Sequence, residues 1–200
     1  MLFHSGSFLI FFPIVALLYF LVPCKVKHLW LLAASYYFYM SWNPEYAVLI
    51  LVSTVSTWGS ALLLSAWRER GGKQWDRAGG WCLAGCVALN LGILFFFKYY
   101  GFAADSVEKL FSLGNISLEL PVFDVLLPVG ISFYTFQAIG YLVDVWRGET
   151  RAEKNFLHYA LFLSFFPQLV AGPIERSGNL LHQIREPHKF DSGRVKDGLL

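Results

Sequence analysis

The side chains best suited to chemistry are a few phenols and amides inside long apolar stretches. Tyr134, Gln137 and Tyr141 are separated by three and four residues, a spacing that places them on one face of a helix. A buried amide such as Gln137 or Gln168 needs a hydrogen-bond partner, and a neighbouring helix is the usual one. The alternative is that these groups line a passage for a substrate. The sequence leaves both interpretations open.

A carboxylate and a guanidinium follow a helix breaker near the end of the chain. Glu175 and Arg176 come shortly after Gly172 and Pro173. They could fix a buried loop or contact a charged donor at the mouth of a cavity. They could equally form an ion pair at the membrane surface, which contributes little free energy. The candidate inward-facing residues are therefore Tyr134, Gln137, Tyr141, Gln168, Glu175 and Arg176.

The histidines, which are the usual acid and base groups near neutral pH, lie outside any catalytic pattern. His158 alone stands near an apolar segment, and none of the five occurs in a triad or a two-histidine metal motif. The three cysteines give neither an even disulfide framework nor a zinc spacing. The sequence therefore names no catalytic residue and predicts no metal site.

The composition is that of a membrane protein. Of the 200 residues, 56% are hydrophobic and 15% are charged, and the mean hydropathy is +0.50. An average soluble domain carries about 25% charged residues, so this chain lacks the surface of an ordinary cytosolic protein. Its net charge of +2 is too small for a nucleic-acid partner. We expect an integral membrane protein with the lipid bilayer as its surroundings.

Six stretches lack Asp, Glu, Lys and Arg over lengths that approach the roughly 20 residues needed to cross a bilayer. The first four are predicted to be spanning helices. We therefore expect an all-α polytopic fold with about six membrane-embedded helices. The stretches are residues 5–24, 29–44, 46–67, 78–97, 125–143 and 155–174.

Basic residues follow the first, third and fifth segments, whereas the turn at residues 42–45 after the second has none. Because Lys and Arg favour cytoplasmic loops, this pattern predicts an extracytoplasmic N-terminus. A full crossing by the sixth segment would move Arg185 and other basic residues outside. Pro167 and Pro173 also interrupt helical hydrogen bonding in that segment. We therefore expect the last two segments to be broken or re-entrant.

Two polar residues have predicted local partners. Asn90 lies inside the fourth apolar segment, where a contact with a neighbouring helix is the simplest use of its amide. Asp144 precedes Arg147 by three residues, which favours a local ion pair on the helix.

Several segments together resemble one family. They are residues 3–13, the run at 31–44, the motif at 127–137, the motif at 141–148 and the motif at 165–176. This combination is similar to the membrane-bound O-acyltransferases, in particular the branch of the alginate O-acetylation and teichoic-acid D-alanylation proteins. The resemblance covers nearly the whole chain.

The resemblance implies acyl transfer across the bacterial inner membrane. An acyl thioester, either acetyl-CoA or an acyl-carrier protein, would be a substrate on the cytoplasmic side, with no bound cofactor. The acceptor would be an extracytoplasmic protein or a polysaccharide such as alginate, reached through a tunnel that the six candidate residues help to line. The family's catalytic histidine stands in a Trp-His context on a later helix, and that motif does not occur in residues 1–200. Residues 1–200 are therefore expected to be the N-terminal part of the acyltransferase domain and inactive alone.

Two other classes of protein compete with this interpretation. Broken helices also mark transporters and flippases, of which this chain could be one half. The chain could also be a non-catalytic membrane scaffold that recruits a partner through its aromatic surface.

Overall fold

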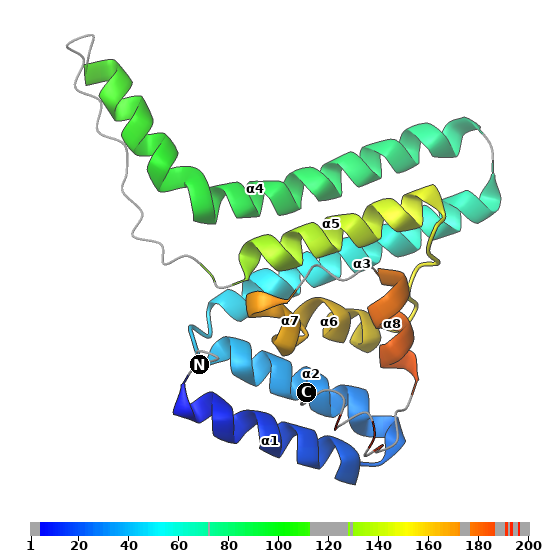
Figure 1. Cartoon of the computed structure of the whole chain (residues 1–200). Helices are drawn as coiled ribbons and strands as arrows, with labels where there is room; N and C mark the ends of the chain where they lie inside the picture. The colour runs from blue at the N-terminus through cyan, green and yellow to red at the C-terminus, as the bar shows by residue number, and fades with distance from the viewer. Residues whose placement is uncertain are drawn as a thin grey trace.

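The protein is helical in a computed structural model, which describes residues 5–71, 73–112, 128, 130–172, 177–186, 191, 193 and 196. These residues contain no strand, and this confirms the predicted all-α class (Figure 1). The elements are α1 (Gly6–Leu21), a 3-10 turn η1 (Cys24–Val26), α2 (Lys27–Met40), α3 (Tyr46–Arg70), α4 (Lys73–Ser112), α5 (Ile131–Arg147), α6 (Phe156–Ser164), α7 (Phe166–Ala171) and α8 (Ser177–Arg185).

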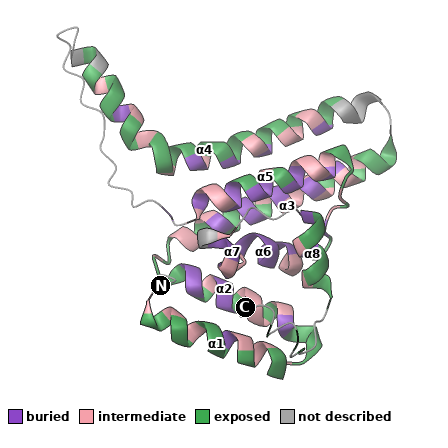
Figure 2. Ribbon diagram, viewed as in Figure 1, coloured by how far each residue is buried: buried purple, intermediate pink, exposed green. Residues whose placement is uncertain are grey.

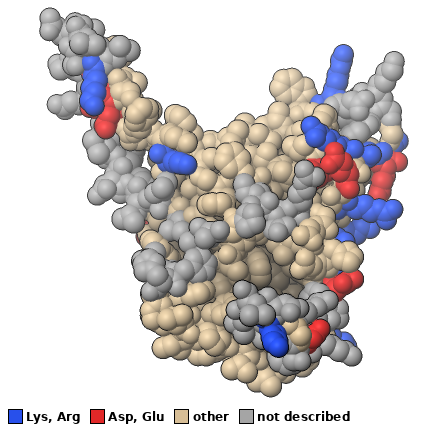
Figure 3. Space-filling view, in the orientation of Figure 1, with Lys and Arg blue, Asp and Glu red and all other residues tan. Residues whose placement is uncertain are grey.

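Helices α1 to α5 run back and forth between two ends of a bundle (Figure 1). Helix α3 packs against α4 and α5, while α2 packs against α1, α3 and α6. Helices α3 and α5 end at one end of the bundle, and α2 and α4 begin there. Basic and acidic side chains gather at this end (Figure 3), which we call the charged end. Figure 2 shows that the buried residues concentrate in α5, α6 and the inner side of α3.

Among the residues that the structure describes, two helices are long and apolar enough to cross a membrane: α3 and residues Arg77–Lys109 of α4. Helices α1, with 16 residues, and α2, with 14, are shorter than the spans predicted for the first and second segments. Pro23 accounts for the early end of α1, because it forces the preceding Val22 into an extended conformation. Within the described part of the chain, helix length therefore supports two of the six predicted spans.

The fifth segment differs from its prediction in one respect. Helix α5 is unbroken from Ile131 to Arg147, whereas a broken or re-entrant segment was expected; residues 125–127 and 129 lie outside the described residues. Its N-cap, Gly130, has φ +75°, and a Cβ there would lie 2.6 Å from the Leu169 carbonyl oxygen. Glycine at this position therefore lets the start of α5 approach α7 closely.

The sixth segment is broken, as predicted. Helix α6 ends at Ser164, Phe165 is extended with ψ 108°, and α7 begins at Phe166. Pro167 lies in the first turn of α7, where its missing N–H is harmless. Beyond this break, the hydroxyl of Ser177 donates to Asp144 at 3.0 Å, near the end of α5. The chain from Asn155 to Ser177 thus begins and ends at the charged end, which is the geometry of a re-entrant segment.

Together with the predicted extracytoplasmic N-terminus, this geometry predicts that α8 lies on the cytoplasmic face of the membrane. In a background without native cysteines, Asn179→Cys should be protected from a membrane-impermeant maleimide in intact spheroplasts, as should Arg151→Cys at the same end. Glu45→Cys, at the opposite end, should react. All three positions are exposed. Labelling of Asn179→Cys together with Glu45→Cys would show that the segment crosses completely.

Candidate functional site

The break between α6 and α7 exposes backbone groups that other helices satisfy. In a continuous helix the Phe166 N–H would donate to the Phe162 carbonyl. Here the Phe166 N–H donates to Ser35 Oγ on α2 at 3.3 Å. The Phe162 carbonyl instead accepts from Gln137 Nε2 on α5 at 2.9 Å. Two side chains from different helices therefore bind the backbone groups that the break leaves unpaired.

The polar face of α5 is buried against α6 and the loop before it. Tyr134 and Tyr141 are each 1% exposed and Gln137 is 5% exposed, in keeping with their spacing along one face. The Tyr141 hydroxyl accepts from the Glu153 N–H at 2.9 Å. The Tyr141 ring lies 4.6 Å from the ring of Tyr159. This face therefore meets protein instead of lipid.

The structure has a larger cavity beside α1 and α2 and a smaller one between α7 and α8. None of these three residues borders either cavity. Their predicted position along a tunnel therefore stays a prediction, and their present contacts are packing contacts between helices. Gln168 differs, because it is buried and borders a small cavity of about 250 Å³ between α7 and α8. Glu175 and Arg176 lie outside the described residues.

A second buried polar layer joins α3 to its neighbours. Ser53 Oγ donates to Asn90 Oδ1 at 2.5 Å, which confirms the predicted contact of Asn90 with another helix. Thr57 Oγ1 lies 2.7 Å from the Tyr159 hydroxyl. Sequence reasoning missed Ser53 and Thr57, although their i,i+4 spacing inside an apolar stretch marks one polar face of α3.

Helix α8 is fastened to the loop between α5 and α6 by charged groups. The Glu153 carboxylate is buried, with its side chain 6% exposed, and its Oε2 accepts from Arg185 Nε at 2.6 Å. Its Oε1 accepts from the Asn155 N–H at 2.9 Å. We call this Glu153–Arg185 contact, with the Ser177–Asp144 hydrogen bond, the α8 latch.

The predicted pair of Asp144 with Arg147 is wrong. Asp144 accepts from Ser177 at 3.0 Å, and Arg147 lies 3.9 Å from the carboxylate of Glu149. The tertiary contact prevails because Ser177 is buried beside Asp144, whereas the guanidinium of Arg147 is more than half exposed and gains little from a local carboxylate.

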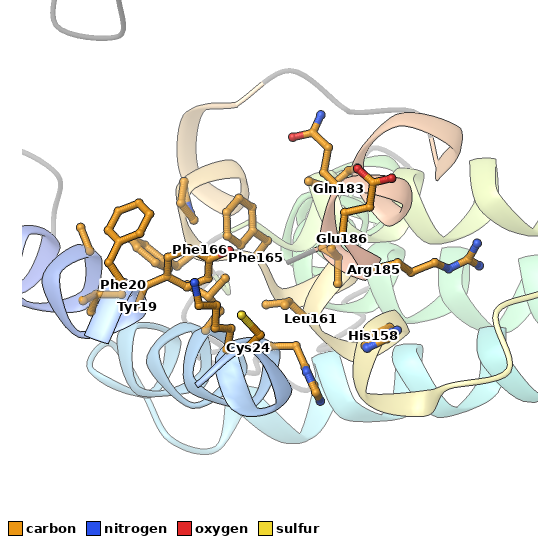
Figure 4. A pocket seen from close by; sticks show the side chains of 18 of the residues that line it. Tyr19, Phe20, Cys24, His158, Leu161, Phe165, Phe166, Gln183, Arg185 and Glu186 are labelled. Atoms are coloured by element: carbon orange, nitrogen blue, oxygen red, sulfur yellow. The ribbon is translucent and has the colours of Figure 1, made fainter. Parts of the chain in front are cut away.

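A larger cavity of about 520 Å³ lies between two groups of helices, α1 with α2 and α6 with α7 and α8. Figure 4 shows Tyr19 and Phe20 on one side, His158 and Arg185 on the other, and Phe165 between them. His158 borders this cavity, and the sequence gave it no catalytic role. The ring of His158 lies 4.9 Å from that of His28. These residues are far apart in the chain, so no spacing rule could have grouped them.

Removing the Gln137 amide should destabilise the fold. Gln137→Leu leaves the Phe162 carbonyl without this donor in an apolar interior, and we expect a loss of about 0.6–1.7 kcal/mol in unfolding free energy. SDS-induced unfolding in mixed micelles, followed by tryptophan fluorescence, measures this loss. The control is Phe136→Leu, a neighbouring side chain that is 49% exposed. Equal stability of the two variants would show that the amide does not hold the break.

Breaking the α8 latch should loosen α8 selectively. Glu153→Ala removes the carboxylate that binds Arg185, and a hydrogen bond to a charged group contributes about 1.5–3 kcal/mol. We therefore expect amide hydrogen exchange of residues 177–185 to become roughly tenfold faster or more, with α3 unchanged. Glu149→Ala, in an exposed ion pair, is the matched control. Unaltered exchange in α8 after Glu153→Ala would argue against the latch.

Comparisons with known proteins identify relatives over almost the entire chain. It is 37% identical over 193 residues to the probable alginate O-acetylase AlgI of Azotobacter vinelandii, covering 96% of this chain and 38% of that protein. It is 39% identical over 202 residues to the probable alginate O-acetylase AlgI of Pseudomonas syringae pv. tomato, covering 98% of this chain and 38% of the relative. It is 31% identical over 216 residues to the peptidoglycan O-acetyltransferase of Helicobacter pylori, covering 93% of this chain and 39% of the relative.

No family model matches the chain, and no solved structure does. The chain spans about 38% of the length of the curated relatives it matches first. Similarity over nearly its whole length to proteins named as O-acetyltransferases nevertheless confirms the resemblance that the motifs predicted. The chain is therefore a relative, over that part of their length, of the alginate and peptidoglycan O-acetyltransferases.

Proposed function

We propose that this chain is the N-terminal part of a membrane-bound O-acyltransferase that acetylates an exported polysaccharide. The observation that carries the proposal is 37–39% identity over at least 96% of the chain to proteins named alginate O-acetylase. The match to a peptidoglycan O-acetyltransferase is weaker, at 31%, so an alginate-like polysaccharide is the favoured acceptor. The two helices able to cross a membrane support a place in the bilayer.

The charged end of the bundle is proposed to face the cytoplasm, with the N-terminus outside and the inner membrane as the location. Support comes from the basic residues at that end, because Lys and Arg are retained on the cytoplasmic side. An acyl thioester, acetyl-CoA or an acyl-carrier protein, would approach this end. The hydroxyl acceptor, a polysaccharide or an acceptor protein, would approach from the opposite face.

The proposed reaction needs a base, which the family resemblance places beyond residue 200. A histidine beyond residue 200 would remove the proton of the acceptor hydroxyl as its oxygen attacks the thioester carbonyl carbon. The new ester bond forms as the carbon–sulfur bond breaks, and the histidine returns the proton to the sulfur, which leaves as a thiol. The proposed role of this chain is to position the reacting groups. Helices α5, α6 and α7 form a wall, and Gln137 and Ser35 fix the broken segment within it. Tyr134, Tyr141, Gln168, Glu175 and Arg176 remain the candidates along the acyl path.

A chimera tests this function. This chain replaces the matching stretch of the Azotobacter vinelandii relative in a strain that lacks that protein, and NMR measures the O-acetyl content of the exported alginate. We expect the chimera to restore acetylation and the 200-residue chain alone to give none.

Membrane yield and a single size-exclusion peak in detergent establish that the chimera is folded. A folded chimera that leaves alginate unacetylated would contradict the proposal. Acetylation by the isolated chain would contradict the assignment of the base to a later part of the protein.

A further inference from the structure

The larger cavity combines an apolar wall with positive charge. Helix α1 lines it with Phe12, Ala16, Tyr19 and Phe20, which recur at helical spacing along one side of that helix. Leu161, Phe165 and Phe166 form the facing wall from α6 and α7. Such a lining, with few polar groups at one end, is typical of a site for an apolar ligand with a polar head.

The charges of this cavity lie together at the charged end of the bundle. Lys25, Lys27 and Arg185 border it, and Glu186 is the one carboxylate among the described lining residues. Lys27 is only 7% exposed, and its ammonium lies 4.7 Å from the centre of the Tyr19 ring. Arg185 is engaged by Glu153. Among the described lining residues, Lys and Arg side chains therefore outnumber carboxylates by three to one.

The cavity adjoins an exposed apolar surface on α1. Phe12 is 50% exposed and Phe20 is 39% exposed, although both border the cavity. The outer surface of α1 adds Leu17 and Leu21, which are 64% and 75% exposed. A ligand with an acyl chain could therefore enter laterally along α1 and remain in contact with apolar surface throughout.

We propose that this cavity binds one anionic phospholipid of the cytoplasmic leaflet. Its phosphate would lie at Lys25 and Lys27, and one acyl chain would lie along Phe20, Phe12 and Phe166. Basic pockets between membrane helices on the cytoplasmic side are suited to anionic headgroups. The site holds a structural lipid against α1 and is separate from the acetyl-transfer reaction, so the two proposals can fail independently.

Native mass spectrometry of the full chain in detergent tests the site. Phosphatidylglycerol and phosphatidylcholine with identical acyl chains are added at equal concentration, and the bound fractions are compared. We expect a clear preference for phosphatidylglycerol. Each cavity lysine should contribute about fivefold to that preference, so the Lys25→Gln/Lys27→Gln variant should lose roughly 25-fold and bind both lipids alike.

Two further variants separate the site from general surface charge. Arg151→Gln/Lys154→Gln removes two exposed basic residues from the charged end but outside the described lining, and should leave the preference unchanged. Ala16→Trp should fill the cavity and weaken binding of both lipids. An equal loss of preference in the two charge variants would overturn the proposal. Displacement of phosphatidylglycerol by acetyl-CoA would also overturn it, because the cavity would then be a donor site.

Discussion

The arrangement depends on satisfying the backbone where α6 stops and α7 begins. Unpaired amide and carbonyl groups at membrane depth cost several kcal/mol each, so broken helices occur only where protein or water satisfies them. In this protein Gln137 on α5 and Ser35 on α2 provide those bonds. The same contacts require the polar face of α5 to turn inward and bring α2 against α6. One break thus determines how three parts of the bundle pack.

The break also divides the protein into two chemically distinct regions. On the α5 side, phenols and amides are buried in direct contact between helices. On the α1 side, a cavity of about 520 Å³ remains between aromatic walls, with lysines at its mouth. Helix α8 closes the charged end over both regions through Glu153 and Arg185. A broken segment of this kind allows polar groups to lie inside an apolar bundle in contact with protein.

Much of this arrangement could be predicted because it follows from local rules. The spacing of Tyr134, Gln137 and Tyr141 fixes one helical face, and Pro167 disfavours a continuous sixth helix. Helix ends were harder to predict from the sequence. Pro23 shortens α1, and the start of α5 is set by a close approach of Gly130 to Leu169. The cavity could not be predicted at all. Its residues come from α1, α2, α6, α7 and α8, and only tertiary packing brings them together.

The most direct test of the account is a disulfide cross-link between the end of α5 and the start of α8 in native membranes. Asp144→Cys and Ser177→Cys replace side chains that are hydrogen-bonded at 3.0 Å. In a background without native cysteines, copper phenanthroline should join this pair quickly and should leave the pair of Glu45→Cys with Ser177→Cys unjoined. If Ser177→Cys joins Glu45→Cys and not Asp144→Cys, the segment crosses the bilayer and the re-entrant account is wrong.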